Sequence, residues 1–290
     1  MNAANGSGGV IWRRFVRSRL ALAALVYVVC VTILAAAAPI LATSSRAGAI
    51  PFGPDDVDIA SRLQPPDANH RLGTDDVGRD VLARMLHGAR VSLAVGFLAT
   101  AIALVIGSTL GALAGYYGGA ADWVISRLIE IILCFPFLFL VLGIVALFGP
   151  SLYTIMIALG VTSWTTEARF VRAEFLRIRE QEFAIAARAS GAGDVRIIFR
   201  HLLPNALAPV LVSASFGVAS AILTESALSF LGFGVPIPTA TWGSILSTAE
   251  QHIESAWWLV AFPGAAIFLT VAAFNIIGDR FRDAMDPRSE

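Results

Sequence analysis

The sequence predicts an all-α membrane protein with six transmembrane helices, on the basis of its composition, its apolar runs and the placement of its arginines. Hydrophobic residues make up 57% of the 290 residues and charged residues only 14%, against roughly 25% charged residues in soluble domains. Apolar runs recur at lengths near the roughly 20 residues that span a hydrocarbon core. The surplus of apolar side chains is therefore expected to face lipid.

The first span is expected at residues 20–41. It follows a basic segment that contains four arginines: Arg13, Arg14, Arg17 and Arg19. A basic flank before the first span favours the cytoplasmic side of the membrane. Because the run is too long for the apolar core of a signal peptide, we expect it to be retained as an anchor. Residues 1–42 are accordingly predicted to form a cytoplasmic N-terminus and the first transmembrane helix.

Residues 43–87 are predicted to form an extracytoplasmic loop with an amphipathic helix. The stretch up to about residue 70 is polar and rich in proline, which suits an exposed loop. From Leu72 to Arg90 the apolar residues recur at helical spacing, and Thr74 or Asp75 can cap a helix at the outer interface. Three arginines here oppose the positive-inside rule, and we expect nearby aspartates to offset them: Arg79, Arg84 and Arg90, with Asp75, Asp76 and Asp80.

Residues 88–278 are predicted to form the main transmembrane domain, followed by a cytoplasmic tail at residues 279–290. The remaining spans are expected at residues 91–116, 124–148, 152–164, 204–231 and 257–277. In the second span, Gly107, Gly111 and Gly115 recur every four residues, a pattern that lets another helix approach closely. In the third span, Arg127 and Glu130 are expected to pair along one helix face.

The segment between the fourth and fifth spans, residues 167–201, carries many charges and is predicted to be a cytoplasmic helical insert. Gly191 and Gly193 are expected to interrupt it, with Asp194 capping a second short helix. Pro204 is expected to begin the fifth span. With six spans, the N-terminus, this insert and the tail arginines lie on one side, as the positive-inside rule requires. Those tail residues are Arg280, Arg282 and Arg288.

The insert resembles the coupling loop of ABC importer permeases. The residues that match this loop in register are Ala186, Ala187, Gly191, Leu203 and Pro204. Ile185 stands in place of the usual Glu and His201 in place of the usual Ile, and both departures resemble the dipeptide, oligopeptide and nickel branch. Further segments are similar to that branch: residues 72–80, 226–234, 242–243 and 278–287.

The resemblance implies a type I ABC importer permease fold with cytoplasmic coupling helices, within residues 167–205. It implies a bacterial inner-membrane subunit that works with a homologous second permease, two cytoplasmic ABC ATPase subunits and an extracytoplasmic substrate-binding protein. The implied cargo is a dipeptide or oligopeptide, with a nickel chelate as the alternative. The residues predicted to couple the chain to the ATPases are Glu182, Ala186, Ala187, Gly191, Asp194, His201, Leu203 and Pro204.

No catalytic constellation, cofactor site or metal site is evident, so we expect no enzyme activity. The chain contains no lysine, and a Walker A loop needs its lysine on the nucleotide phosphates. ATP must therefore be hydrolysed on another subunit. The zero net charge gives no support for binding nucleic acid. A secondary transporter that works without ATP is the competing class, although the intramembrane carboxylates and internal repeats typical of it are not evident.

Polar residues inside the spans are candidates for the translocation pathway because they are costly in lipid unless they are paired or face water. We predict Glu225 and Ser226 to line the pathway, with a structural hydrogen bond to a neighbouring helix as the alternative for Glu225. Cys30 and Cys134 lack the spacing of metal or redox motifs. They are expected to be small buried core residues.

Overall fold

The computed structural model describes residues 4–44 and 49–285. Within these ranges the chain is helical, and its only β-type pairing consists of two isolated bridges. The helices are α1 (Ala4–Arg17), α2 (Arg19–Leu41), α3 (Val81–Tyr117), α4 (Gly119–Leu133), α5 (Phe137–Phe148), α6 (Leu152–Ile178), α7 (Glu182–Ala189), α8 (Asp194–Arg196), α9 (Leu203–Phe230), α10 (Trp242–Thr248) and α11 (Trp258–Met285). Three shorter helical segments complete the set. They are the 3₁₀ helices η1 (Ile59–Ser61) and η3 (Ala249–Gln251) and the π-helix η2 (Ile197–Leu202).

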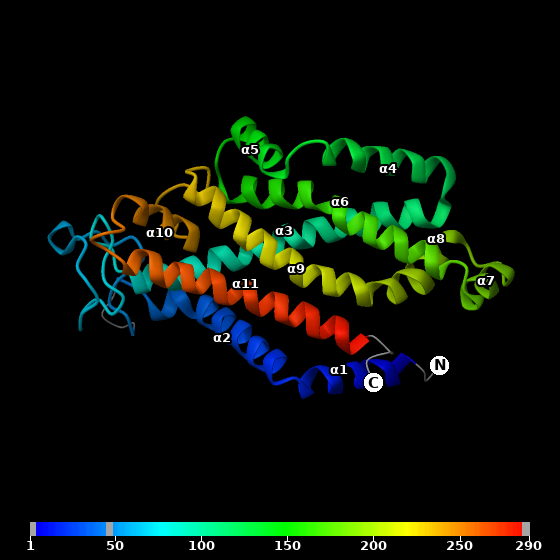
Figure 1. Cartoon of the computed structure of the whole chain (residues 1–290), viewed down its shortest axis with the longest axis horizontal. Helices are drawn as coiled ribbons and strands as arrows, with labels where there is room; N and C mark the ends of the chain where they lie inside the picture. The colour runs from blue at the N-terminus through cyan, green and yellow to red at the C-terminus, as the bar shows by residue number, and fades with distance from the viewer. Residues whose placement is uncertain (1–3, 45–48, 286–290) are drawn as a thin grey trace.

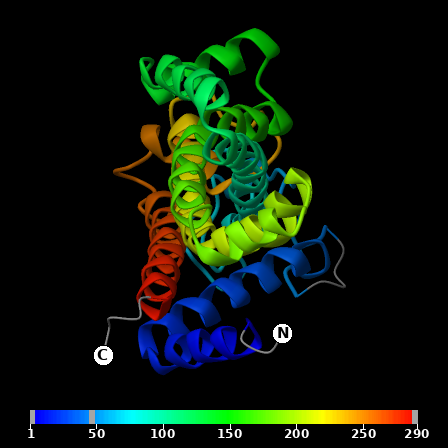
Figure 2. The same cartoon turned by 90° about the vertical axis from the view of Figure 1, so that its right-hand side faces the viewer.

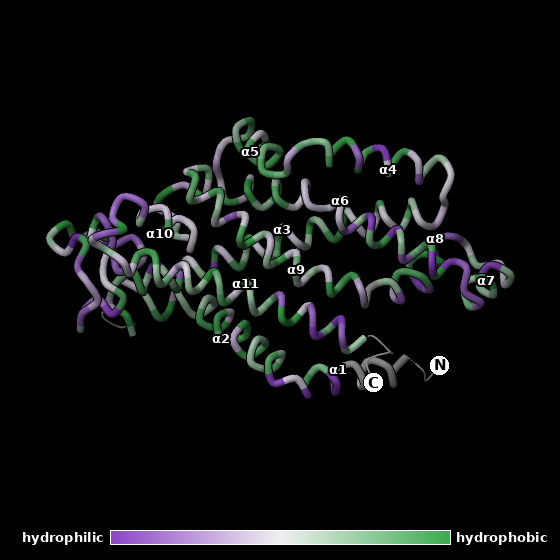
Figure 3. Tube along the Cα trace, viewed as in Figure 1, coloured by the Kyte–Doolittle hydropathy of each residue, from purple (hydrophilic) through white to green (hydrophobic). Residues whose placement is uncertain are grey.

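The long helices α3, α6, α9 and α11 run side by side along the length of the molecule (Figure 1). Figure 2 views the bundle along its length and shows α1 and α2 at one edge, opposite the segment that contains α4 and α5. Hydrophilic residues gather at the two ends of the bundle, and hydrophobic residues lie along the helices between them (Figure 3). This distribution is the one expected of a helical membrane protein.

Four of the described helices are long and apolar enough to cross a membrane: α2, α3, α11 and the part of α9 from Pro209 to Phe230. The pair α4 and α5 adds a fifth span if the two helices are counted together. The fourth predicted span, residues 152–164 at the start of α6, falls short because polar residues interrupt its apolar run from residue 162 to residue 167. Length and composition therefore support four or five of the six predicted spans.

The span predicted at residues 124–148 is not one continuous helix. α4 ends at Leu133, α5 begins at Phe137, and the two helices are bent by 86°. The break lies at Pro136, which has no N–H to donate and disfavours helical backbone in the residue before it. Arg127 and Glu130 do form the predicted ion pair along α4.

The separate amphipathic helix predicted near Leu72 is also not present. Residues 72–80 form a loop instead, and Asp80 is the N-cap of a single helix that runs through to Tyr117. The Asp80 carboxylate accepts a hydrogen bond from the backbone N–H of Ala83 at 2.8 Å. The predicted boundary between residues 87 and 88 thus lies inside α3, because no residue there breaks the helix.

The three regularly spaced glycines of α3, Gly107, Gly111 and Gly115, lie against α6 at very short range. A Cβ built on Gly107 would lie 2.5 Å from Cβ of Glu167, and one on Gly111 would lie 2.5 Å from the carbonyl oxygen of Ala168. A Cβ on Gly115 would lie 2.6 Å from Cβ of Phe175. Such backbone contact needs residues without side chains.

Cys30 and Cys134 are exposed on the described surface, contrary to the prediction that they are buried. Cys30 lies on α2 at the edge of the bundle, and Cys134 lies at the break after α4. An apolar run in a membrane protein has one face toward protein and another toward lipid. Apolar neighbours in the sequence therefore do not imply burial within the protein.

Candidate functional site

Between α3, α6 and α9 lies a cavity of about 470 Å³, closed on another side by residues around the break between α4 and α5. Its wall combines apolar side chains, among them Phe135 and Phe216, with hydroxyl groups from three helices. The hydroxyl-bearing residues include Thr100, Thr165, Ser213, Ser220 and Thr224. A mostly apolar wall with a few polar groups is typical of sites that bind small molecules.

Among the described residues, Glu167 is the one charged residue that lines this cavity. It is 6% exposed, and its Oε2 accepts a hydrogen bond from Oγ of Ser213 on α9 at 2.6 Å. Sequence reasoning placed Glu167 at the start of the cytoplasmic insert and gave it no role in the pathway. The polar run that precedes it, residues 162–166, was the available signal that this part of α6 faces a polar space.

The predicted pathway residues Glu225 and Ser226 do not line this cavity. Glu225 is fully buried and accepts a hydrogen bond from Oγ of Ser229, one turn away, at 2.7 Å. Ser226 donates to the carbonyl of Ile222 in its own helix at 2.8 Å. For Glu225 this bond lies within α9 and does not reach a neighbouring helix, and its Oε2 is buried without a hydrogen-bond partner among the described residues. Its neighbour Thr224 does line the cavity.

A second candidate site is the surface formed by α7. The helix packs on the bundle through Ala184, which is fully buried in one apolar cluster with Phe175 and Leu202. The opposite side of α7 is exposed, including the predicted coupling residues Glu182 and Ala186. Its exposed apolar side chains, Phe183 and Ile185, suit contact with another protein rather than with water.

Gly191 ends α7 in a Schellman motif. Its N–H donates to the carbonyl of Arg188 at 2.9 Å, and the N–H of Ala192 donates to the carbonyl of Ala187 at 3.2 Å. Gly191 has a φ of +74°, a conformation that favours glycine. The predicted interruption of the insert at this glycine is therefore present in the backbone.

Asp194 does not cap the following helix as predicted, because Gly193 occupies the N-cap position. Its Oδ1 instead accepts a hydrogen bond from the Tyr116 hydroxyl at 2.7 Å, and the Arg188 guanidinium lies 5.3 Å from the centre of the Tyr116 ring. The insert between α6 and α9 is thus tied to the last turn of α3. Of the other predicted coupling residues, His201 lies in η2, while Leu203 and Pro204 begin α9.

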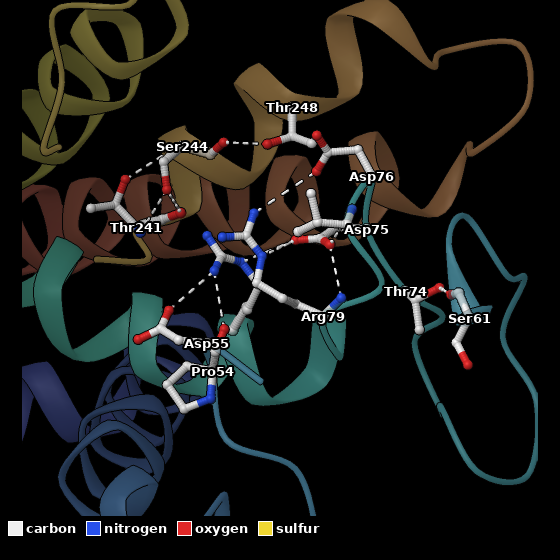
Figure 4. Close-up of polar contacts among 12 residues, drawn as sticks. Pro54, Asp55, Ser61, Thr74, Asp75, Asp76, Arg79, Thr241, Ser244 and Thr248 are labelled. Carbon is white, nitrogen blue, oxygen red and sulfur yellow. Dashed lines mark hydrogen bonds and ion pairs between the residues drawn. The ribbon is translucent and has the colours of Figure 1, made fainter. Parts of the chain in front are cut away.

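At the other end of the bundle, Asp75 holds two buried arginines (Figure 4). Its Oδ2 lies 2.7 Å from Nε of Arg79 and 3.6 Å from Nε of Arg84. Arg84 also donates to the carbonyl of Pro54 at 3.0 Å. As predicted, the charge of Asp75 offsets both arginines. Asp76 also offsets Arg79, at a distance of 3.8 Å. Asp80 pairs with a histidine instead.

We expect Asp75→Asn to destabilise the protein by about 3 kcal/mol, since removing one partner of a buried ion pair leaves charge uncompensated. The matched control is Asp76→Asn, which alters a partly exposed and longer ion pair and should cost less than about 1 kcal/mol. Thermal unfolding of both variants in mild detergent measures the difference. Equal unfolding midpoints would show that Asp75 does not stabilise this loop.

Comparison with known families identifies the class of protein. Residues 107–290 match the family described as binding-protein-dependent transport system inner membrane component. Residues 8–66 match the N-terminal TM domain of oligopeptide transport permease C. Together these two matches cover most of the chain, including the α7 surface and the cavity-lining parts of α6 and α9. The part of α3 that lines the cavity lies between the two matched ranges.

Similar proteins extend over nearly the whole chain. The dipeptide transport system permease protein DppC of Alkalihalophilus pseudofirmus is 45% identical over 277 residues, which is 96% of this chain and 88% of that protein. The di/tripeptide transport system permease protein DppC of Pseudomonas aeruginosa is 39% identical over 283 residues, covering 96% and 91%.

Among solved structures, an inward-facing conformation of the MetNI methionine ABC transporter is similar with a TM-score of 0.58. The match has 21% identity and covers 71% of this chain and 98% of that one, so it indicates a shared fold. The family match over more than half of the chain and the relatives at 39–45% identity lead to one conclusion. The chain belongs to the inner-membrane permease components of binding-protein-dependent ABC importers.

Proposed function

We propose that this chain is a permease subunit of an ATP-driven importer for dipeptides and similar short peptides. The observation that carries the proposal is the 45% identity to a dipeptide transport permease over 96% of the chain. The cavity of about 470 Å³ supports it, because ligand sites for small molecules have volumes of roughly 300–1,000 Å³. The names of the relatives favour a peptide over a nickel chelate.

In this proposal the chain works in an assembly. A homologous second permease completes the pathway, and two ATPase subunits dock on the α7 surface at the cytoplasmic end. Both termini would lie at that end, a placement supported by Figure 1, where α1 and the end of α11 lie toward the same end of the bundle as α7. The substrate-binding protein would deliver cargo at the opposite end, formed by residues 50–80 and α10.

The link between ATP and transport would be mechanical. ATP binding between the ATPases favours one state of the permease pair through contacts at α7 that differ between states. Two contacts would carry the resulting displacement into the bundle. The first is the hydrogen bond from Tyr116 to Asp194. The second is the hydrogen bond from Nη1 of Arg179 to the carbonyl of Gly115 at 3.0 Å.

Reconstitution tests the proposal. The chain, its partner permease and the two ATPases are placed in liposomes, and uptake of a radiolabelled dipeptide is followed with and without the binding protein. We expect uptake to require both ATP and the binding protein. Uptake by the chain in liposomes that contain no ATPase would instead indicate a secondary transporter and contradict the proposal.

A further inference from the structure

We propose that the cavity around Glu167 is a subsite in which the Glu167 carboxylate binds the ammonium group of the passing peptide. This inference rests on the proposed function, since it assigns a recognition role to one residue of the pathway. It is carried by three observations on the described residues: an acidic side chain without a cation beside it, a buried hydroxyl without a partner, and a cavity of suitable size that contains both.

The carboxylate of Glu167 is in an unusual position for an acidic group. It is almost fully buried, it lies in the part of α6 that packs between α3 and α9, and among the described residues it forms no ion pair. Its one hydrogen bond comes from the neutral hydroxyl of Ser213. The second oxygen, Oε1, receives no hydrogen bond from a described residue. A carboxylate held inside a membrane protein without a counter-charge is costly unless a cation or water approaches it.

Thr100 supplies the second observation. It lies on α3 and lines the same cavity as Glu167, yet its buried Oγ1 has no hydrogen-bond partner in the described part of the chain. On the facing helix stands Gly217, at which a Cβ would lie 3.3 Å from Oγ1 of Thr100. The backbone of Gly217 therefore packs close to this hydroxyl, and a side chain at position 217 would press on Thr100. An unpartnered buried hydroxyl is an available acceptor or donor for a ligand.

The chemistry of these groups favours an organic ammonium. An ammonium group has three donors and no acceptor, and a carboxylate with neighbouring hydroxyl oxygens offers matching acceptors. A metal ion is a poorer fit, because the described residues contain no group of three His, Cys, Asp or Glu side chains that could hold one. The apolar part of the wall, including Leu159 and Phe216, can accommodate varied peptide side chains without selecting among them.

The fold also fixes where this carboxylate lies. Glu167 lies directly against Gly107 of α3. A Cβ added to Gly107 would lie 2.5 Å from the Cβ of Glu167. It is held from the other side by Ser213 of α9. The three helices that surround the cavity thus meet at this residue, so a ligand bound there would contact the elements expected to move during transport.

The test measures uptake of a radiolabelled dipeptide by the full complex in liposomes, together with ATP hydrolysis. We expect Glu167→Gln to lower uptake about tenfold or more, since hydrogen bonds to charged groups contribute about 1.5–3 kcal/mol. ATP hydrolysis stimulated by the loaded binding protein should remain, because the α7 surface is unchanged. The matched control is Glu174→Gln, two turns further along α6, where Glu174 pairs with Arg177. This control should leave uptake unchanged.

Two further variants separate recognition from a structural role. Ser213→Ala removes the hydrogen bond to Glu167 but keeps the carboxylate, so uptake should fall much less than in Glu167→Gln. The double variant Glu167→Ser with Ser213→Glu returns a carboxylate to the same wall from the facing helix, and it should recover part of the uptake that Glu167→Ser loses.

The outcomes are distinguishable. If Glu167→Gln retains wild-type uptake, or if Ser213→Ala loses as much uptake as Glu167→Gln, the carboxylate is structural and the subsite is wrong. If the wild-type complex hydrolyses ATP but takes up no dipeptide, the proposed function itself fails, and the cargo assigned to the subsite fails with it.

Discussion

Gly111→Leu is expected to leave little folded protein in the membrane. A Cβ at Gly111 alone would lie 2.5 Å from the carbonyl oxygen of Ala168 and 2.9 Å from Cβ of Val171. Backbone and Cβ atoms cannot rotate away, so α3 and α6 would have to separate along their whole contact. Overpacking of an ordinary core costs about 1–3 kcal/mol, and we expect a larger loss here because two helices must move.

The matched control is Gly264→Leu in α11, where an added Cβ would have no heavy atom within 4 Å. Size-exclusion chromatography in mild detergent measures the amount of monodisperse protein for both variants. We expect the Gly264 variant to be recovered at close to the wild-type yield and the Gly111 variant to be lost or aggregated. Equal recovery of the two would show that the close contact of α3 and α6 is not needed for folding.

Gly191→Trp is expected to abolish dipeptide uptake while the permease still inserts in the membrane. A residue with a Cβ at the left-handed position of Gly191 costs about 1–2 kcal/mol, which weakens the Schellman motif that ends α7. The tryptophan ring would also project from the exposed side of the insert, where the ATPases are proposed to dock. Both effects disturb the coupling surface and leave the membrane helices untouched.

The readouts for this variant are membrane yield, ATP hydrolysis and uptake in the reconstituted complex. Uptake should fall at least tenfold relative to ATP hydrolysis, which marks uncoupling rather than loss of protein. Gly193→Ala is the matched control, because Gly193 has a φ of −67° and open space around it. Wild-type uptake by the tryptophan variant would remove the coupling role assigned to this loop.

The sequence predicted the helical class and most of the long helices because apolar runs, and the arginines beside them, can be recognised from the order of residues alone. It did not predict the break in the third span, although Pro136 was a visible signal, because the surrounding residues are apolar on both sides. It also misplaced the start of α3. Thr74, Asp75 and Asp80 all have side chains that can cap a helix, and only the folded loop decides that Asp80 does so.

The residues that line the cavity could likewise be predicted only in part from the sequence. Glu167 and Glu225 both lie among apolar and hydroxyl residues in the sequence, and their spacing says nothing about which of them faces a cavity. That depends on how α6 and α9 are rotated against α3. The glycine pattern of α3 predicted a close helix contact, but it could not identify α6 as the partner.

The length of α3 has a mechanical consequence. Its 37 residues extend for about 55 Å at 1.5 Å per residue, well beyond a hydrocarbon core of about 30 Å, and contain no proline hinge. One end carries Arg84 and the loop held by Asp75, and the other carries Tyr116. For a rod of this length, a tilt of about 5° at one end displaces the other by about 5 Å. A partner that docks on the loop held by Asp75 and one that pushes on the insert around α7 would therefore act on opposite ends of the same lever.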